Sequence, residues 1–111
     1  MKLWGLKTCD SCRKALKALD EAGAPAEFVD VRKALDAETL GRWVAAVGAE
    51  ALLNRSSTTW RGLSDAEKAG DPAAVMLAHP SLVKRPVIEA EGAVLVGKGA
   101  VAAALARAGK S

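Results

Sequence analysis

The chain has 111 residues, of which 50% are hydrophobic and 26% are charged, and its formal net charge is +3. This length supports one hydrophobic core, and the balance of apolar and charged residues excludes a disordered or fibrous chain, so we expect a single domain over residues 1–111. The basic residues are interleaved with Asp and Glu, which argues against direct nucleic-acid binding.

The first third of the chain has the pattern of a strand, a helix and a second strand. Residues 2–6 form a short apolar run that predicts a strand. From Asp10, apolar residues recur at spacings of three and four until Gly23, which predicts a helix. Residues 26–31, AEFVDV, alternate as a strand does. This order predicts a βαβ unit with two parallel strands and a right-handed crossover.

The middle of the chain, about residues 34–80, is predicted to be a helical insertion. A short helix is expected in residues 49–54, and the hydroxyl-rich residues 55–63, RSSTTWRGL, favour turns. Three polar residues are predicted to cap helices: Asp36, Ser64 and Asp71. His79 is the single histidine, and its place before a proline favours a capping or surface residue over a catalytic base.

The last third of the chain predicts a β-hairpin and a final helix. Two apolar runs, RPVIEA and AVLVG, flank Glu91-Gly92. An alanine-rich helix is expected over about residues 100–108. The complete order is β-α-β, helical insertion, β-β-α. With a C-x-x-C pair at the first strand-to-helix junction, this order predicts an α/β protein with a thioredoxin-like fold and a four-stranded mixed sheet.

The two cysteines, Cys9 and Cys12, are the candidate site of chemistry. No apolar run reaches the length of a spanning helix or of a signal-peptide core, so we expect a cytoplasmic protein without membrane contact. In that reducing compartment a close cysteine pair favours redox chemistry or metal binding over a structural disulfide. Zinc needs more ligands than the cysteines and one histidine offer, so no metal is expected.

Cys9 has the surroundings of a reactive thiol. It precedes the predicted first helix, where unpaired backbone N–H groups favour an anion. Lys7, Arg13 and Lys14 add positive charge nearby, which would lower the pKa of a thiol. Cys12 lies one helical turn further along. Its role is either that of a thiol that resolves a mixed disulfide on Cys9 or that of an apolar residue of the core.

A second informative stretch is VKRPV, residues 83–87. Pro86 stands at the mouth of a predicted strand, where its missing N–H is tolerated. An Arg85–Pro86 bond in the cis form would turn the backbone toward the helix that carries Cys9, while an ordinary trans proline opening a strand is the alternative.

Four segments in register resemble the arsenate reductase/Spx family of thioredoxin-like proteins, most closely its YffB-like branch: LKTCDSCRKAL, EALLNRSSTTWRGL, HPSLVKRPV and GAVLVGKG. The resemblance implies a thioredoxin fold with a helical insertion, a nucleophilic Cys9 and a cis Arg85–Pro86 bond facing it. It also implies that glutathione or another thiol is the reductant, and that basic residues hold an oxyanion or a glutathione carboxylate.

The chain departs from arsenate reductases of the glutaredoxin-dependent type, which carry three arginines around the cysteine. Of these, only Arg85 matches, because Asn54 and Gly97 stand at the other two positions. A tetrahedral oxyanion would lose two bidentate partners, for which Lys98 could substitute only as a point charge. The segment CDSCRKA is similar to the redox switch of Spx regulators, which bind RNA polymerase.

The leading prediction is therefore a glutathione-dependent thiol-disulfide oxidoreductase that forms a mixed disulfide on Cys9. The alternative is a Spx-like regulator that binds RNA polymerase through a Cys9–Cys12 switch, and the third is an arsenate reductase. We expect no tightly bound cofactor, a monomer, and a reductant that is glutathione or a protein of the glutaredoxin or thioredoxin type. The predicted substrate-binding residues are Lys7, Thr8, Arg13, Arg55, Arg85 and cis Pro86.

Overall fold

The computed structural model describes residues 1–109 and divides into two compact units. The sheet unit consists of Met1–Val31 and the chain from Arg85 onward, and the helical unit consists of Arg32–Lys84. The predicted insertion at residues 34–80 falls within the helical unit. Within residues 1–109, no helix combines the length and the apolar character that crossing a membrane requires.

The sheet unit is built on four strands: β1 (Lys2–Gly5), β2 (Glu27–Asp30), β3 (Val87–Ala90) and β4 (Ala93–Val96). Their order in the sheet is β2-β1-β3-β4. The β1 and β2 strands are parallel, whereas β3 is antiparallel to both of its neighbours. The predicted mixed sheet and the thioredoxin-like fold are thus confirmed.

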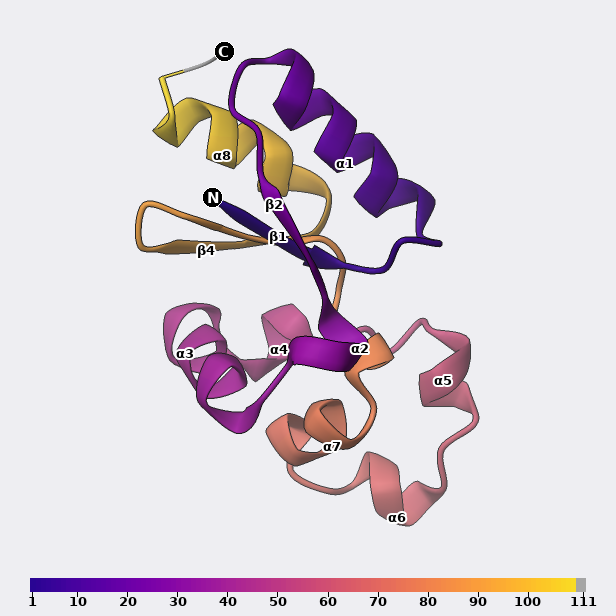
Figure 1. Ribbon diagram of the computed structural model, residues 1–111. Helices are drawn as coiled ribbons and strands as arrows, with labels where there is room; N and C mark the ends of the chain where they lie inside the picture. Colours follow the sequence, from indigo (N-terminus) through magenta and orange to yellow (C-terminus); the bar gives the residue numbers. More distant parts are fainter. Residues whose placement is uncertain (110–111) are drawn as a thin grey trace. The chain divides into compact units, whose positions relative to one another are not determined.

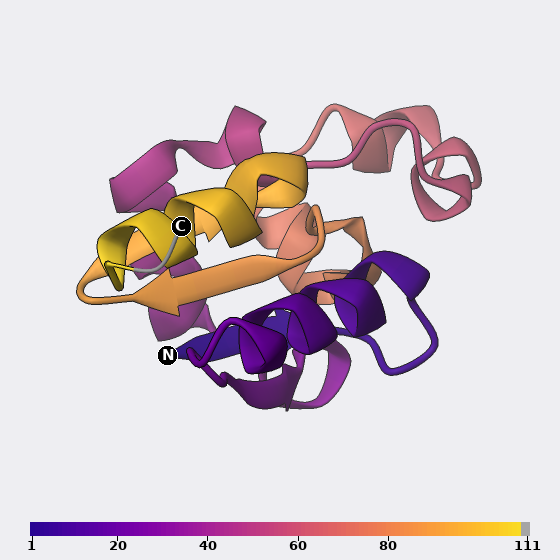
Figure 2. The same ribbon diagram turned by 90° about the horizontal axis from the view of Figure 1, so that it is seen from above.

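Two helices, α1 (Asp10–Glu21) and α8 (Ala100–Arg107), lie side by side on one face of this sheet (Figure 1; Figure 2). Leu3 of β1 and Ile88 of β3 are register partners and point their fully buried side chains into the same core. The helices contribute small residues and one leucine to it. The buried members of this core are Leu3, Cys12, Ala15, Leu19, Ile88, Ala90, Ala100 and Ala104.

The first strand ends one residue earlier than predicted. Leu6 leaves the ladder because its carbonyl accepts a hydrogen bond from the Cys9 N–H at 3.1 Å. The chain therefore turns over Lys7 and Thr8 and delivers Cys9 to the start of α1. Cys9 owes its position to this turn.

The helical unit contains short helices that begin where polar side chains cap them. Its elements are α2 (Val31–Ala34, which starts in the sheet unit), α3 (Ala37–Val47), α4 (Ala49–Leu52), α5 (Thr58–Arg61), α6 (Asp65–Lys68), α7 (Pro72–Ala78) and the 3₁₀ turn η1 (Pro80–Leu82). The three predicted caps are confirmed: Asp36, Ser64 and Asp71 accept from the backbone N–H groups of Thr39, Glu67 and Ala74.

The prediction for residues 55–63 was wrong in part, because Thr58–Arg61 forms a helical turn. The Ser57 hydroxyl accepts a hydrogen bond from the Trp60 N–H at 3.1 Å, so the hydroxyl-rich segment caps a helix as well as making turns. The α2 helix was not predicted from the sequence.

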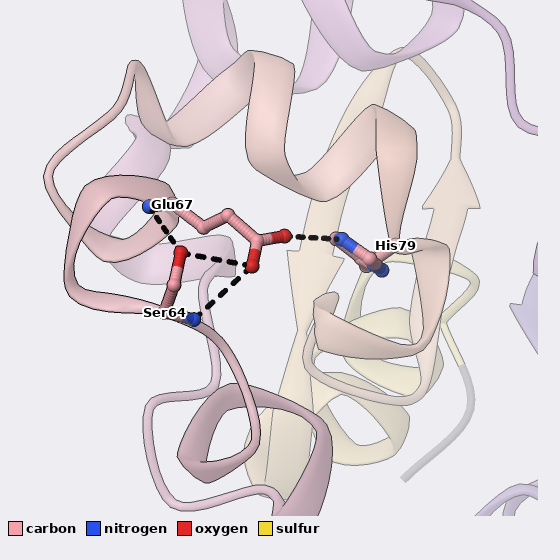
Figure 3. Close-up of polar contacts among 3 residues, drawn as sticks. All are labelled: Ser64, Glu67 and His79. Atoms are coloured by element: carbon pink, nitrogen blue, oxygen red, sulfur yellow. Dashed lines mark hydrogen bonds and ion pairs between the residues drawn. The ribbon is translucent and has the colours of Figure 1, made fainter.

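His79 caps the C-terminal end of α7, as expected. Its backbone N–H donates to the Val75 carbonyl at 2.9 Å. Its ring Nε2 lies 3.4 Å from Oε2 of Glu67, whose other oxygen accepts from the Ser64 N–H in the capping box (Figure 3). These contacts give His79 a structural role in joining the start of α6 to the end of α7.

Candidate active site

Cys9 occupies the N-cap position of α1. Its backbone is extended (φ −87°, ψ 120°), and its carbonyl accepts the first helical hydrogen bond, from the Arg13 N–H at 3.0 Å. Its side chain is half-buried and caps no backbone N–H. The unpaired N–H groups of the first turn and the positive end of the helix dipole therefore act on a sulfur that remains accessible.

Cys12 is fully buried and packs against β1. A Cβ built on Gly5 would lie 2.3 Å from the Cys12 Sγ, which is closer than two such atoms approach. Only a residue without a side chain fits at this point of the strand. Cys12 belongs to the buried core, which was one of its two expected roles, and its role as a resolving thiol stays a prediction.

Arg85 stands at the entry to β3 and completes the surroundings of Cys9. Its peptide bond to Pro86 is cis. Its positively charged guanidinium is one of the groups that lower the pKa of the Cys9 thiol. The Pro86 carbonyl accepts from the Gly97 N–H at 2.9 Å, which holds the start of β3 against the end of β4.

The pKa values of the two thiols are shifted in opposite directions. Burial alone would raise the pKa of Cys9, but the backbone N–H and the thiol of Cys12, together with the positively charged Arg85, lower it below its ordinary value. Burial is the main cause that raises the pKa of Cys12 to about 11; the backbone of Leu6 opposes the rise and the neighbouring Cys9 adds to it. Of the two thiols, Cys9 is therefore the one whose thiolate form is favoured.

A pocket of about 350 Å³ opens on the face of α1 that looks toward α8. Arg85, which helps to lower the pKa of Cys9, and Pro86 form part of its wall. The other lining residues come from α1, from η2 (Gly97–Gly99) and from α8: Ser11, Lys14, Ala15, Ala18, Gly97, Lys98 and Val101.

Lys7, Thr8 and Arg13 are near Cys9 in the chain but not in that pocket. Lys7 and Thr8 are exposed in the turn before α1, and Arg13 forms an ion pair with Asp10 on the helix surface. Lys7 and Arg13 line a separate hollow of about 330 Å³ with Leu6, Leu16 and Phe28. Helical periodicity puts Arg13 and Lys14 on different sides of α1.

Arg55 and Asn54 belong to the helical unit. The Arg55 guanidinium pairs with both carboxylate oxygens of Glu50 and stacks 5.5 Å from the Trp60 ring centroid. The Asn54 Oδ1 accepts from the Ser56 N–H at 3.0 Å and shapes a turn. The predicted role of Arg55 in substrate binding stays a prediction.

Among residues 1–109, no three side chains of His, Cys, Asp or Glu come together in a way that could hold a metal ion.

Sequence reasoning missed Gly5 and the role of Lys14 as a lining residue. A glycine inside a short strand can mark a close approach of another element, and that signal was available at Gly5. Ser11, Lys14, Ala15 and Ala18 follow the spacing of one helix face. Their common pocket could not be recognised without knowing that α8 lies beside α1.

The comparisons with known proteins agree with this architecture. The ArsC family model matches residues 4–101. The solved structure of the YFFB (PA3664) protein is 44% identical, covers 93% of this chain and 96% of its own, and has a TM-score of 0.84. An arsenate reductase (ArsC) related protein from Brucella melitensis is 41% identical, with 88% of each chain covered and a TM-score of 0.73.

A protein of Haemophilus influenzae is 34% identical over 100 residues, which span 86% of this chain and 88% of that protein. The match to the family model extends from β1 into α8 and so includes both cysteines, Arg85 and the whole helical unit. The chain therefore belongs to the ArsC family.

Proposed function

We propose that the protein is a thiol-disulfide oxidoreductase in which Cys9 is the nucleophile. The observation that carries this proposal is the position of Cys9 as the partly exposed N-cap of α1, where the helix start favours the thiolate and Arg85 helps to lower its pKa. The Cys9 thiolate attacks one sulfur of a disulfide, a new Cys9 disulfide forms, the old disulfide breaks, and the second sulfur leaves as a thiolate that takes up a proton.

Glutathione is the proposed co-substrate, and the cycle uses one protein thiol. A glutathione thiolate attacks the mixed disulfide on Cys9, which releases the reduced Cys9 thiolate and oxidises the attacking glutathione to a disulfide. Cys12 is a poor competitor for this step, because it is fully buried and its pKa is raised to about 11. At pH 7 only about one Cys12 in ten thousand would be a thiolate.

The experiment measures reduction of bis(2-hydroxyethyl) disulfide by glutathione, with glutathione reductase and NADPH reporting the oxidised glutathione formed. Wild-type protein should accelerate the reaction, Cys9→Ser should abolish the acceleration, and Cys12→Ala should keep most of it. Equal rates with wild type and Cys9→Ser would overturn the proposal.

A second candidate is a redox-sensing protein of the Spx kind that binds RNA polymerase. The observation in its favour is that Cys9 and Cys12 lie at the two ends of the first turn of α1 and that each affects the pKa of the other. RNA polymerase would be captured from a lysate in one redox state and not in the other. Its absence from both states would remove this candidate.

Arsenate reduction is the third candidate. Gly97 has no side chain, and the Asn54 side-chain oxygen is used in a turn, so two of the three expected guanidinium groups are missing. Absence of arsenate turnover with glutathione and glutaredoxin would remove it.

A further inference from the structure

We propose that the hollow beside the start of α1 binds a bulky apolar side chain of a polypeptide substrate, next to the disulfide that Cys9 attacks. The inference rests on the proposed function, since it names a substrate class for the same thiol: a polypeptide whose cysteine is joined to glutathione. The hollow has a volume of about 330 Å³ and shares no lining residue with the pocket at Arg85 and Pro86. It is lined by Leu6, Lys7, Arg13, Leu16 and Phe28.

Three of these five residues are hydrocarbon side chains from three parts of the sheet unit. Leu6 follows β1, Leu16 is on α1, and Phe28 is on β2, which lies at an edge of the sheet. Leu16 and Phe28 pack against the core of the unit but stay partly exposed. A ligand group that covers these two side chains removes apolar surface from water, which favours binding.

The volume and the lining of the hollow suit one large hydrocarbon group. The volume is near the lower end of the range for small-molecule pockets, roughly 300–1,000 Å³. None of the described lining residues has a hydroxyl, amide or carboxylate side chain. A polar uncharged group would lose its hydration there with few partners to replace it. A leucine, methionine or phenylalanine side chain has no such loss.

The hollow adjoins the nucleophile through the backbone. The Cys9 N–H donates to the Leu6 carbonyl at 3.1 Å, and the Arg13 N–H donates to the Cys9 carbonyl at 3.0 Å. Cys9 also packs against the same core as Leu16 and Phe28. Because residues on both sides of Cys9 line the hollow, a polypeptide whose disulfide meets Cys9 can place a neighbouring side chain in it.

The charges at the hollow select the residues around that side chain. Lys7 is exposed and forms no ion pair with any residue of the described chain 1–109, whereas Arg13 is paired with Asp10. The hollow therefore keeps a net positive charge. Complementary charges favour the encounter with a partner and like charges oppose it, so an acidic residue beside the apolar one is preferred to a basic one.

The reaction at this site is an exchange of one disulfide for another. The Cys9 thiolate attacks the glutathione sulfur and forms a Cys9–glutathione disulfide. The original disulfide breaks, and the polypeptide sulfur leaves as a thiolate that takes up a proton. A second glutathione then restores the Cys9 thiolate and becomes oxidised glutathione, as in the proposed cycle.

The test compares three eight-residue peptides, each with a single cysteine joined to glutathione. The first peptide has Glu and Leu directly before the cysteine, the second has Ser in place of the Leu, and the third has Lys in place of the Glu. Glutathione reductase and NADPH report the oxidised glutathione, and the rate with Cys9→Ser is subtracted. Wild type should prefer the Leu peptide to the Ser peptide about five- to ten-fold in kcat/KM, and the Glu peptide to the Lys peptide about two- to five-fold.

Two variants and two matched controls assign these preferences to the hollow. Leu16→Ser should remove most of the preference for Leu. Leu105→Ser should keep it, because Leu105 packs against the same core but does not line the hollow. Lys7→Glu should reverse the preference for Glu, and Lys17→Glu should keep it, since Lys17 pairs with Glu21 and lies outside the hollow. Each preference compares two peptides with one protein, so differences in folded fraction or in thiol reactivity cancel.

Four results would each overturn the proposal: equal kcat/KM of wild type for the Leu and Ser peptides, an unchanged preference in Leu16→Ser, an equal loss in Leu105→Ser, or an unchanged preference for Glu in Lys7→Glu. A wild-type dimer in sedimentation velocity that Leu16→Ser dissociates would show that a second copy of the chain occupies the hollow, and would also overturn it.

Failure of the proposed function would look different. In that case none of the three peptides, and no bis(2-hydroxyethyl) disulfide, would be reduced in a Cys9-dependent way. Equal Cys9-dependent reduction of all three peptides would instead remove only the role of the hollow.

Discussion

A side-chain carbon on Gly5 would lie 2.3 Å from the sulfur of Cys12, so β1 and α1 meet at these two residues. The backbone of the strand approaches the helix here as closely as the buried thiol allows. The lack of a side chain on Gly5 thus lets the first turn of α1, which follows Cys9, pack close to β1.

The first prediction concerns this contact. Gly5→Ala should lower the free energy of unfolding by about 1–3 kcal/mol, because the added methyl group overpacks a full core. Cys12→Ala removes the sulfur, so Gly5→Ala should cost clearly less in that background. Urea denaturation of the two single variants and the double variant measures the coupling. If Gly5→Ala lowered the free energy of unfolding equally in both backgrounds, the close contact between Gly5 and Cys12 would be contradicted.

The second prediction concerns Arg85 and the pKa of Cys9. Arg85→Gln removes a charge and a hydrogen-bond donor that favour the thiolate, so the pKa of Cys9 should rise. The rate of alkylation near neutral pH should fall severalfold, and its midpoint should move to higher pH. The measurement is the pH dependence of iodoacetamide alkylation in the Cys12→Ala background.

Arg107→Gln is the matched control for this experiment, because Arg107 is an exposed arginine in the last turn of α8. A midpoint that moves equally in both variants would show that general charge, and not the Arg85 contact, sets the pKa of Cys9.

The third prediction follows from the raised pKa of Cys12. In the folded protein the Cys12 thiol keeps its proton up to about pH 11, whereas a cysteine in the unfolded chain releases its proton near pH 8.5. The contribution of the protonated Cys12 thiol to the free energy of unfolding is therefore complete below about pH 8.5. It is lost as the pH rises toward 11, by at most about 1.4 kcal/mol per pH unit. Urea denaturation from pH 8 to pH 10 should show a steeper loss in wild type than in Cys12→Ala. If the stability of wild type and of Cys12→Ala fell equally with pH, the raised pKa of Cys12 would be contradicted.

The fourth prediction concerns the cap of α3. The hydrogen bond from the Thr39 N–H lowers the pKa of Asp36, so the contribution of this carboxylate is present above its unfolded pKa and is lost as the pH falls through the folded value. Asp36→Ala should lower the urea midpoint at pH 7, and Asp36→Asn, which still caps, should lower it less. The difference between wild type and Asp36→Asn should shrink in acid. A pH-independent difference would be inconsistent with this cap.

Much of the fold could be predicted because local signals were strong. The alternation in residues 26–31, the Glu91-Gly92 turn and the caps at Asp36, Ser64 and Asp71 each determine structure over a few residues, and each is present. The helical turn at Thr58–Arg61 was missed because serine and threonine favour caps and turns alike, and the sequence does not decide between them.

Cys9 could be identified from the sequence, whereas the residues that line the pocket beside it could not. The start of a helix and a C-x-x-C pair identify Cys9 from a few neighbouring residues. The pocket depends on contacts between residues far apart in the chain, such as Lys14 and Lys98, and no local pattern reports that α8 lies beside α1. The burial of Cys12 against Gly5 is likewise a tertiary contact.

The nucleophilic role of Cys9 is tested most directly by treating Cys12→Ala and Cys9→Ser with oxidised glutathione, followed by intact mass and peptide mapping. Cys12→Ala should gain the mass of one glutathione on Cys9, and native Cys9→Ser, whose remaining thiol is buried, should gain none. The absence of an adduct on Cys9, or an equally fast adduct on Cys12 in native Cys9→Ser, would contradict it.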